Sequence, residues 1–240
     1  MLFQKIKSYK TFYLEIVAIF IGITASFWVD DYRSSLQDDN LSEKYLRGFI
    51  EDFNDDKEQL NELLVVWNSQ LKSAEALLDS IESQELDVDS FYQHYHVVFP
   101  SNAFIPNSNT IEEILNSSHL RLISNESLKN AILEQRNKYR FIASIEEHIY
   151  QDRSVYLYSD LTLANIDLLS WVIVENGELI SNSKNAEVYR RDAEDFLQDR
   201  SFKSFMVLMR FNLKYLIPMT EEVRDQGEAI VAQIQQELKR

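Results

Sequence analysis

The sequence contains no cysteine and only 4 glycines and 3 prolines among its 240 residues. Without cysteine the chain has no disulfide bonds, thiolate zinc sites or cysteine nucleophiles. A sandwich or barrel of β-strands needs a turn roughly every 8–12 residues, and glycine and proline are too scarce here to supply them. The same scarcity argues against a glycine-rich nucleotide-binding loop. The composition therefore predicts a mostly helical chain.

Familiar catalytic and metal-binding motifs are also missing, because the sequence holds no P-loop, GxSxG, HExxH or GxGxxG pattern. His94 and His96 are two positions apart, so on a helix their side chains point in different directions. Neither stands at a metal-ligand spacing from His119 or His148. We expect no enzyme activity, no cofactor and no metal site.

Acidic side chains outnumber basic ones, 39 against 24, which gives a formal net charge of −15. Such a chain is a poor partner for nucleic acid, so none is expected. Three acidic pairs have no glycine-containing calcium loop beside them, and we expect them on solvated faces. These pairs are Asp30-Asp31, Asp38-Asp39 and Asp55-Asp56.

One apolar run covers residues 12–29 and holds a single charge, Glu15. As a helix it rises about 27 Å, close to the ~30 Å thickness of bilayer hydrocarbon. Its apolar residues cover every direction around the helix axis, whereas a core helix usually keeps a polar stripe. We predict a transmembrane helix at residues 12–29, with a buried core helix as the alternative.

The flanks of this run predict its orientation. Lysines precede it within residues 1–11, which hold no acid, and aspartates follow it. This bias predicts a short cytoplasmic N-terminus, a single pass through the inner membrane and a periplasmic remainder. A cleavable signal peptide is the rival interpretation, but no Ala-x-Ala site ends the run, so we favour an uncleaved anchor. The predicted interfacial anchors are Lys5, Lys7, Lys10, Trp28 and Tyr32.

Two features within the run go beyond anchoring. Ala18, Gly22 and Ser26 recur every four residues and form a stripe of small side chains where a second helix can approach, which predicts a homo-oligomer. Glu15 lies on nearly the same face. An ionisable group there points to a pore or proton path, or else it reaches the headgroups or pairs with Lys10.

Beyond the run, residues 30–83 hold only one helix-weakening residue, Gly48. Apolar positions from Tyr45 to Ile81 recur at spacings near 3.5, which predicts one long amphipathic helix. Residues 30–44 are strongly polar and form either a solvated stalk helix or a hinge. The predicted domain is a helical bundle over residues 45–240.

Further helix boundaries follow from capping and turn residues. We expect a short helix at about residues 90–99, then a loop over residues 100–108, then a helix started by a capping box of Thr110 and Glu113. Asn125 is expected to cap a long helix that extends to about residue 163.

The last third of the chain contains a final helical region at about residues 186–239. We expect it to break near residues 199–202 and to bend at Pro218. Residues 171–180 form a hairpin around Asn176-Gly177 or a plain loop. The chain is therefore predicted to be all-α, a transmembrane helix followed by an antiparallel bundle of long helices.

The segment Leu14–Arg33 resembles the N-terminal signature of a family of uncharacterised single-span proteins widespread in Bacteroidota. Asn109–Leu133 is similar to the middle segment of that family, although Ser117-Ser118 stands where a glycine is common. The resemblance implies a membrane-anchored helical domain and supplies no catalytic residues. The matching positions of the first segment are Glu15, Ile16, Gly22, Ile23, Trp28 and Asp30.

The functional prediction is a membrane-anchored helical sensor or scaffold that oligomerises or binds a partner through its span and outer bundle. Its expected partners are the lipid bilayer, further copies of the chain and a membrane or periplasmic protein. The alternative is an oligomeric pore lined by the span. One aromatic run lines a ligand pocket or, as is commoner at helical spacing, belongs to the core. It comprises Phe205, Met209, Phe211 and Tyr215.

Overall fold

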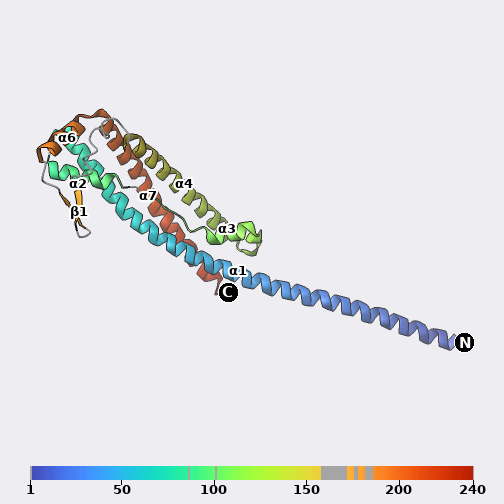
Figure 1. The fold of residues 1–240 in the computed structure, drawn as a ribbon. Coiled ribbons are helices and arrows are strands. Elements are labelled where there is room, and N and C mark those ends of the chain that lie inside the picture. The colour runs from blue at the N-terminus through green and yellow to red at the C-terminus, as the bar shows by residue number, and fades with distance from the viewer. Residues whose placement is uncertain are drawn as a thin grey trace.

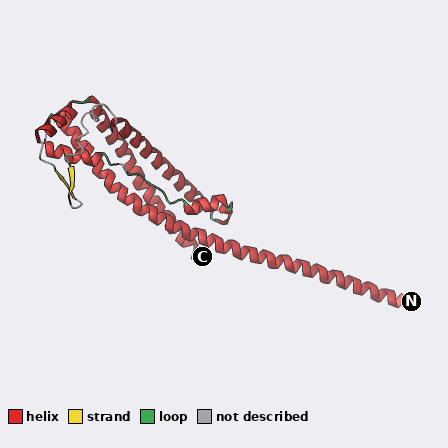
Figure 2. Cartoon of the chain, viewed as in Figure 1, coloured by secondary structure: helices red, strands yellow, loops and turns green. Residues whose placement is uncertain are grey.

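The computed structural model describes residues 2–85, 87–100, 102–157, 172–175, 178–181 and 186–239. Side chains are described throughout these ranges except at residues 2–14, 157, 172–175, 178–181, 186 and 188. The described part is helical apart from loops and one two-stranded hairpin (Figure 2).

Helix α1 (Leu2–Ser83) is unbroken, and its first part projects from the bundle (Figure 1). Residues 30–44 are therefore helical, and the hinge alternative is wrong. The helix ends where Gln84 takes a positive φ of 56°, a left-handed conformation common after a helix C-terminus. The side-chain amide of Gln84 donates to the Ile81 carbonyl at 2.6 Å.

The caps of the short helices differ in part from expectation. Helix α2 (Val88–Val98) begins slightly before the predicted start, because the Asp87 side chain accepts from the N–H groups of Asp89 and Ser90. Helix α3 (Asn109–Asn116) has Ser108 at its N-cap, so the predicted capping box is wrong. A short 3₁₀ helix, η1 (His119–Leu122), follows α3.

The caps of the long helices agree with the sequence. Asn125 Oδ1 accepts from the Leu128 N–H at 3.2 Å, just before helix α4 (Glu126–Leu157). Its predicted extension to residue 163 lies outside the described residues. Asp199 separates α6 (Ala186–Gln198) from α7 (Arg200–Glu237) and accepts from the Phe202 N–H at 2.7 Å. Pro218 lies inside α7.

A hairpin is formed by β1 (Val172–Glu175) and β2 (Glu178–Ser181), which pair antiparallel. Glu175 pairs with Glu178, so only two residues connect the strands. Of the two alternatives for this segment, the hairpin is therefore observed. Asn176 and Gly177 themselves lie outside the described residues.

Three long helices form the body of the bundle, and their directions follow from polar pairs. Lys57 forms an ion pair with Glu228 at 2.8 Å, and Glu75, further along α1, forms one with Lys214, earlier in α7, at 2.7 Å. Helix α7 therefore runs antiparallel to α1. It also runs antiparallel to α4. Helices α1 and α4 are therefore parallel, unlike neighbours in a simple up-and-down bundle. Polar pairs that join α7 to α4 are Lys138–Glu222 and Asp152–Asn212.

The core follows the predicted inner stripe of α1 and ends in an aromatic cluster at the tip of the bundle far from the N-terminus. There Tyr156 stacks on Phe205 with ring centroids 4.8 Å apart. The aromatic run on α7 is divided: Phe205 and Met209 are buried, whereas Phe211 and Tyr215 are exposed. Other members of the cluster are Phe91, Tyr92, Tyr95, Phe99, Phe196 and Phe202.

Gly48 allows α3 to approach α1 closely, and a substitution tests this contact. A Cβ at position 48 would lie 2.7 Å from Thr110 Oγ1, whereas a Cβ at Gly22 would meet nothing within 4 Å. We expect Gly48→Ala to lower the free energy of unfolding by about 1 kcal/mol, because overpacking outweighs the gain in helix propensity. Thermal unfolding of Gly48→Ala and of the control Gly22→Ala measures this.

The contact between positions 48 and 110 is isolated by a double variant. Gly48→Ala combined with Thr110→Ala is expected to recover part of the loss, since the clashing hydroxyl and methyl groups are gone. A Gly48→Ala variant as stable as the parent chain would contradict the prediction.

Candidate functional site

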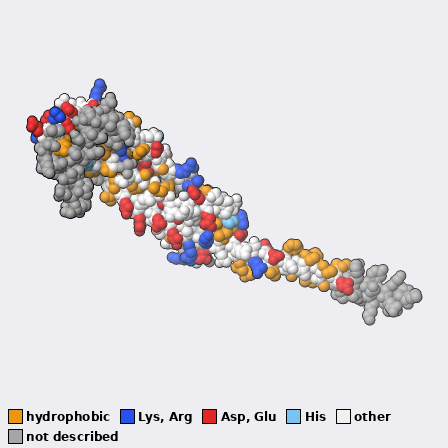
Figure 3. All heavy atoms as spheres, viewed as in Figure 1, with side chains coloured by type: hydrophobic (Ala, Val, Ile, Leu, Met, Phe, Trp, Pro, Cys, Tyr) orange, Lys and Arg blue, Asp and Glu red, His pale blue; other side chains and the backbone are white. Residues whose placement is uncertain are grey.

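The projecting part of α1 carries the predicted association face and leaves it uncovered. Every residue from Glu15 to Gln37 is exposed, including Ala18, Gly22 and Ser26. The large apolar side chains here are exposed as well, with Phe20 at 70 % and Trp28 at 77 % (Figure 3). Tyr32 is 68 % exposed. The side chains of Lys5, Lys7 and Lys10 lie outside the described part.

Among the described side chains, which begin in α1 at Glu15, no helix combines the length and the apolar content of a membrane span. The predicted span begins at Phe12, three residues earlier. The span at residues 12–29 stays a prediction.

The projecting helix meets the bundle through polar contacts. Asp38 bonds Arg121 at 2.8 Å, and this hydrogen bond lowers the pKa of the aspartate. Four residues later, Ser42 Oγ donates to the Leu122 carbonyl at 2.9 Å. Lys44 then bonds Glu113 at 2.9 Å. The η1 and α3 region thus fixes α1 at the point where it enters the bundle.

Residues 99–100 and 102–108, which we call the strap, carry the chain back along the bundle between α2 and α3 as a loop (Figure 2). Because the strap lacks helical and sheet hydrogen bonds, its backbone needs other partners. Gln59 of α1 both accepts from the Ile105 N–H at 2.5 Å and donates to the Ile105 carbonyl at 3.2 Å. Asp56 accepts from the Asn107 N–H at 2.7 Å.

Further side chains hold both ends of the strap. Glu146 of α4 accepts from the Phe104 N–H at 2.9 and 3.1 Å with its two oxygens. Near the start, Gln70 donates to the Pro100 carbonyl at 2.8 Å. Just past the end, Asp52 accepts from the Thr110 N–H at 3.0 Å. Side chains of α1 and α4 therefore replace the missing secondary-structure partners.

Two of these acids are strongly affected by burial. Asp56 is only 1 % exposed, and burial raises its pKa to about 6 although the Asn107 N–H acts in the opposite direction. Burial likewise raises the pKa of the half-buried Glu146 to about 7. The expectation that Asp55-Asp56 lies on a solvated face is wrong for Asp56, because its carboxylate serves the strap.

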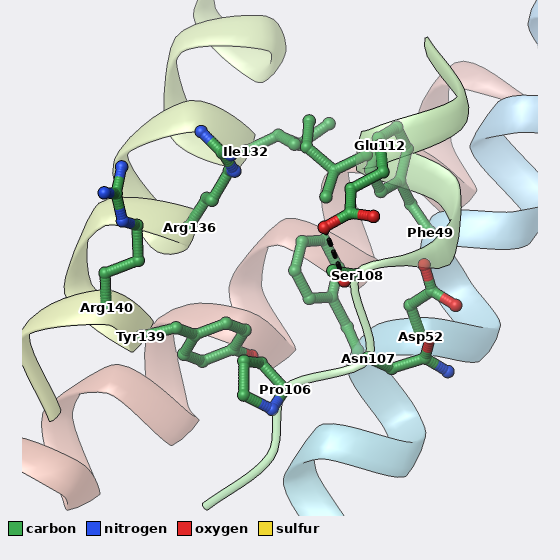
Figure 4. Close-up of a pocket in the computed structure, with 12 residues that line it drawn as sticks. Phe49, Asp52, Pro106, Asn107, Ser108, Glu112, Ile132, Arg136, Tyr139 and Arg140 are labelled. Atoms are coloured by element: carbon green, nitrogen blue, oxygen red, sulfur yellow. Dashed lines mark hydrogen bonds between the residues drawn. The ribbon is translucent and has the colours of Figure 1, made fainter. Parts of the chain in front are cut away.

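A cavity of about 380 Å³ lies where the strap, α1, α3 and α4 meet (Figure 4). Glu112 on one side accepts from Ser108 Oγ at 3.0 Å, and Asp52 is engaged with Thr110. Arg136 and Arg140 rise from α4 on the other side and form no ion pair or hydrogen bond with described residues. The apolar lining consists of Phe49, Phe53, Pro106, Ile111, Ile132 and the ring of Tyr139.

The histidines singled out in the sequence serve local contacts. His94 Nδ1 lies 3.2 Å from Ser73 Oγ, and His119 Nδ1 lies 2.9 Å from the Tyr45 hydroxyl. Within the described ranges, no three His, Asp or Glu side chains come together as a metal site.

Two buried polar residues interrupt the apolar stripe of α1 in the sequence. The apolar stripe of α1 skips a turn between Phe53 and Leu60, and Asp56 occupies the position where a core residue belongs. Gln70 interrupts the same stripe further along. Polar residues at core positions are therefore a signal for a buried polar partner, here the strap backbone.

Comparison with known protein families, curated proteins and solved structures finds no match for this chain. The resemblance to the single-span family of Bacteroidota stays a prediction.

Titration of Glu146 predicts how stability depends on pH. A carboxyl with a raised pKa holds its proton more tightly in the folded chain, so the free energy of unfolding falls as pH rises through the window from about 4.5 to about 7. Acidification from about pH 7.5 to about pH 5.5 should therefore stabilise the chain more than it stabilises Glu146→Gln, by up to roughly 1.4 kcal/mol per pH unit. Denaturant unfolding at several pH values measures the difference.

The control for this experiment is Glu147→Gln, which changes the exposed neighbour of Glu146. A glutamine at position 146 still offers an oxygen to the Phe104 N–H but cannot titrate. If Glu146→Gln and the parent chain show the same pH dependence, the assignment of this titration to Glu146 is wrong.

Proposed function

We propose that this protein is a membrane-anchored helical module whose span at residues 12–29 holds the bundle at a bilayer and mediates assembly. One observation carries the proposal: the projecting part of α1 exposes large apolar side chains on all sides. Burying one such side chain is worth about 1.5–3 kcal/mol, so a long uncovered series of them is costly in water. The exposed series consists of Ile16, Val17, Ile19, Phe20, Ile21, Ile23, Phe27, Trp28 and Val29.

The distribution of these side chains favours a bilayer over a single protein groove. A helix that packs in one groove needs an apolar stripe on one face, as α1 itself has between Tyr45 and Ile81. The projecting part is apolar all round, which suits an environment that surrounds the helix. Lysines before the run and aspartates after it support an orientation with the bundle on the periplasmic side.

The continuity of α1 supports a role as sensor or scaffold. The same helix supplies the anchor and the side chains that hold the strap, so a change of tilt at one end displaces the other. Asp38 and Lys44 tie α1 to η1 and α3 where the bundle begins. A partner bound to the bundle is therefore coupled to the bilayer segment without an intervening flexible linker.

Membrane association is tested by flotation of the full chain with phosphatidylcholine–phosphatidylethanolamine vesicles. We expect the parent chain to float with the vesicles and to resist extraction by alkaline carbonate. Ile19→Lys combined with Ile23→Lys should abolish flotation, because charges at a helix centre oppose insertion by about 2.5–3.5 kcal/mol each. Val65→Lys changes an apolar side chain on the bundle that is more exposed than Ile19 or Ile23, and this variant should float like the parent. A parent chain that stays in the aqueous fraction would refute anchoring.

Assembly is tested separately by the mass of the full chain in nanodiscs or mild detergent. We expect a defined oligomer that Gly22→Leu disrupts, since a leucine side chain separates helices whose backbones approach at Ala18, Gly22 and Ser26. Thr24→Leu adds similar bulk about 200° around the helix and should leave the mass unchanged. A monomer for the parent chain would limit the span to anchoring.

A further inference from the structure

The cavity between the strap, α3 and α4 has one apolar part and one cationic part. Aromatic and aliphatic side chains from α1, α3 and α4 form its floor, among them Phe49, Phe53 and Ile132. Its volume of about 380 Å³ falls within the range of small-molecule sites, which is roughly 300–1,000 Å³. Figure 4 shows Arg136 and Arg140 on the α4 side and Glu112 on the opposite side.

The charges around the cavity are not balanced against one another. Asp52 and Glu112 already accept hydrogen bonds from Thr110 and Ser108. Arg136 and Arg140 remain without an acidic partner among described residues, although acidic side chains far outnumber basic ones in this chain. Two like charges four residues apart on one helix are mildly destabilising, so nothing in the fold itself benefits from the pair.

We propose that this cavity binds a small organic acid with a single carboxylate and an aromatic or branched aliphatic body. The body occupies the floor beside Phe49 and Phe53, and the carboxylate accepts hydrogen bonds from Arg136 and Arg140. A guanidinium group suits this role, because its planar set of donors matches the two oxygens of a carboxylate.

The opposite wall restricts the ligand to one charged end. Glu112 and Asp52 lie on the side away from the arginines, and a second carboxylate placed there would be repelled. The site therefore distinguishes a monocarboxylate from a molecule with carboxylates at both ends. This inference goes beyond the proposed anchoring and does not depend on it, since binding is measured directly and holds whether or not the chain floats with vesicles.

The test is calorimetric titration of the full chain in mild detergent with 3-phenylpropionate. Its neutral counterpart, 3-phenylpropanol, and the double-ended acid 1,4-phenylenediacetate serve as comparison ligands, and the same detergent without protein is titrated to subtract partition into micelles. We expect saturable binding of 3-phenylpropionate and at least tenfold weaker binding of 3-phenylpropanol, since a hydrogen bond to a charged group is worth about that much. We also expect at least tenfold weaker binding of 1,4-phenylenediacetate, because its second carboxylate meets Glu112 and Asp52.

Variants assign the binding to the cavity. Arg136→Gln combined with Arg140→Gln should weaken binding of 3-phenylpropionate at least tenfold, whereas Lys138→Gln should leave it within about twofold. Lys138 lies on the same helix and carries the same charge, but it bonds Glu222 of α7 instead of lining the cavity. Glu112→Gln should reduce the difference in affinity between 3-phenylpropionate and 1,4-phenylenediacetate, because it removes a negative charge from the opposite wall.

Three results would overturn the proposal. They are the absence of saturable binding of 3-phenylpropionate up to about 10 mM, equal binding of the acid and the alcohol, and unchanged affinity in the double arginine variant. Circular dichroism and thermal unfolding of that variant confirm that it is folded. Neither arginine has a partner in the described part, so its loss should alter stability by no more than about 0.5 kcal/mol.

Discussion

The described residues of the strap have no helical or sheet hydrogen bonds, and the arrangement of the bundle depends on the side chains that bond the strap backbone instead. A buried N–H without a partner costs about 1–3 kcal/mol, and in the strap this applies to Phe104, which is 3 % exposed. Asp56 and Gln59 of α1 and Glu146 of α4 supply the acceptors. With these bonds the chain returns along the bundle as a loop, so that α4 starts near the end from which α1 projects and runs parallel to α1 (Figure 1). The same path places residues 106–108 as one wall of the cavity.

Local sequence signals predicted most of the fold, because they act over three to four residues. The periodicity of α1, the cap at Asn125 and the break at Asp199 are of this kind. The predicted start of α3 was wrong because long-range contacts determine it. Thr110 has the composition of a cap, yet its N–H donates to Asp52 on α1 and its side chain packs against Gly48. A partner more than fifty positions away along the chain outweighed the local preference.

Local sequence also predicted only part of the candidate site. The apolar character of the projecting part of α1 follows from composition alone, and the structure leaves these side chains exposed. Their role in a bilayer stays a prediction. The cavity combines residues near positions 50, 108 and 136, which no spacing rule connects. Asp56 was assigned to a solvated face because adjacent acids usually are solvated. In the fold its carboxylate accepts a hydrogen bond from the Asn107 N–H, a partner about fifty positions away that no local pattern reveals.

The uninterrupted backbone of α1 also sets a distance. From Asp30 to Ser83 the helix rises about 80 Å. Shortening this part of the helix would require breaking its backbone hydrogen bonds. If residues 12–29 lie in a bilayer as proposed, and α1 stands upright, the aromatic cluster at the far tip is held at a fixed height above the lipid surface. In that arrangement only a partner that reaches this height contacts the tip, so the length of one helix would select partners by their size and position.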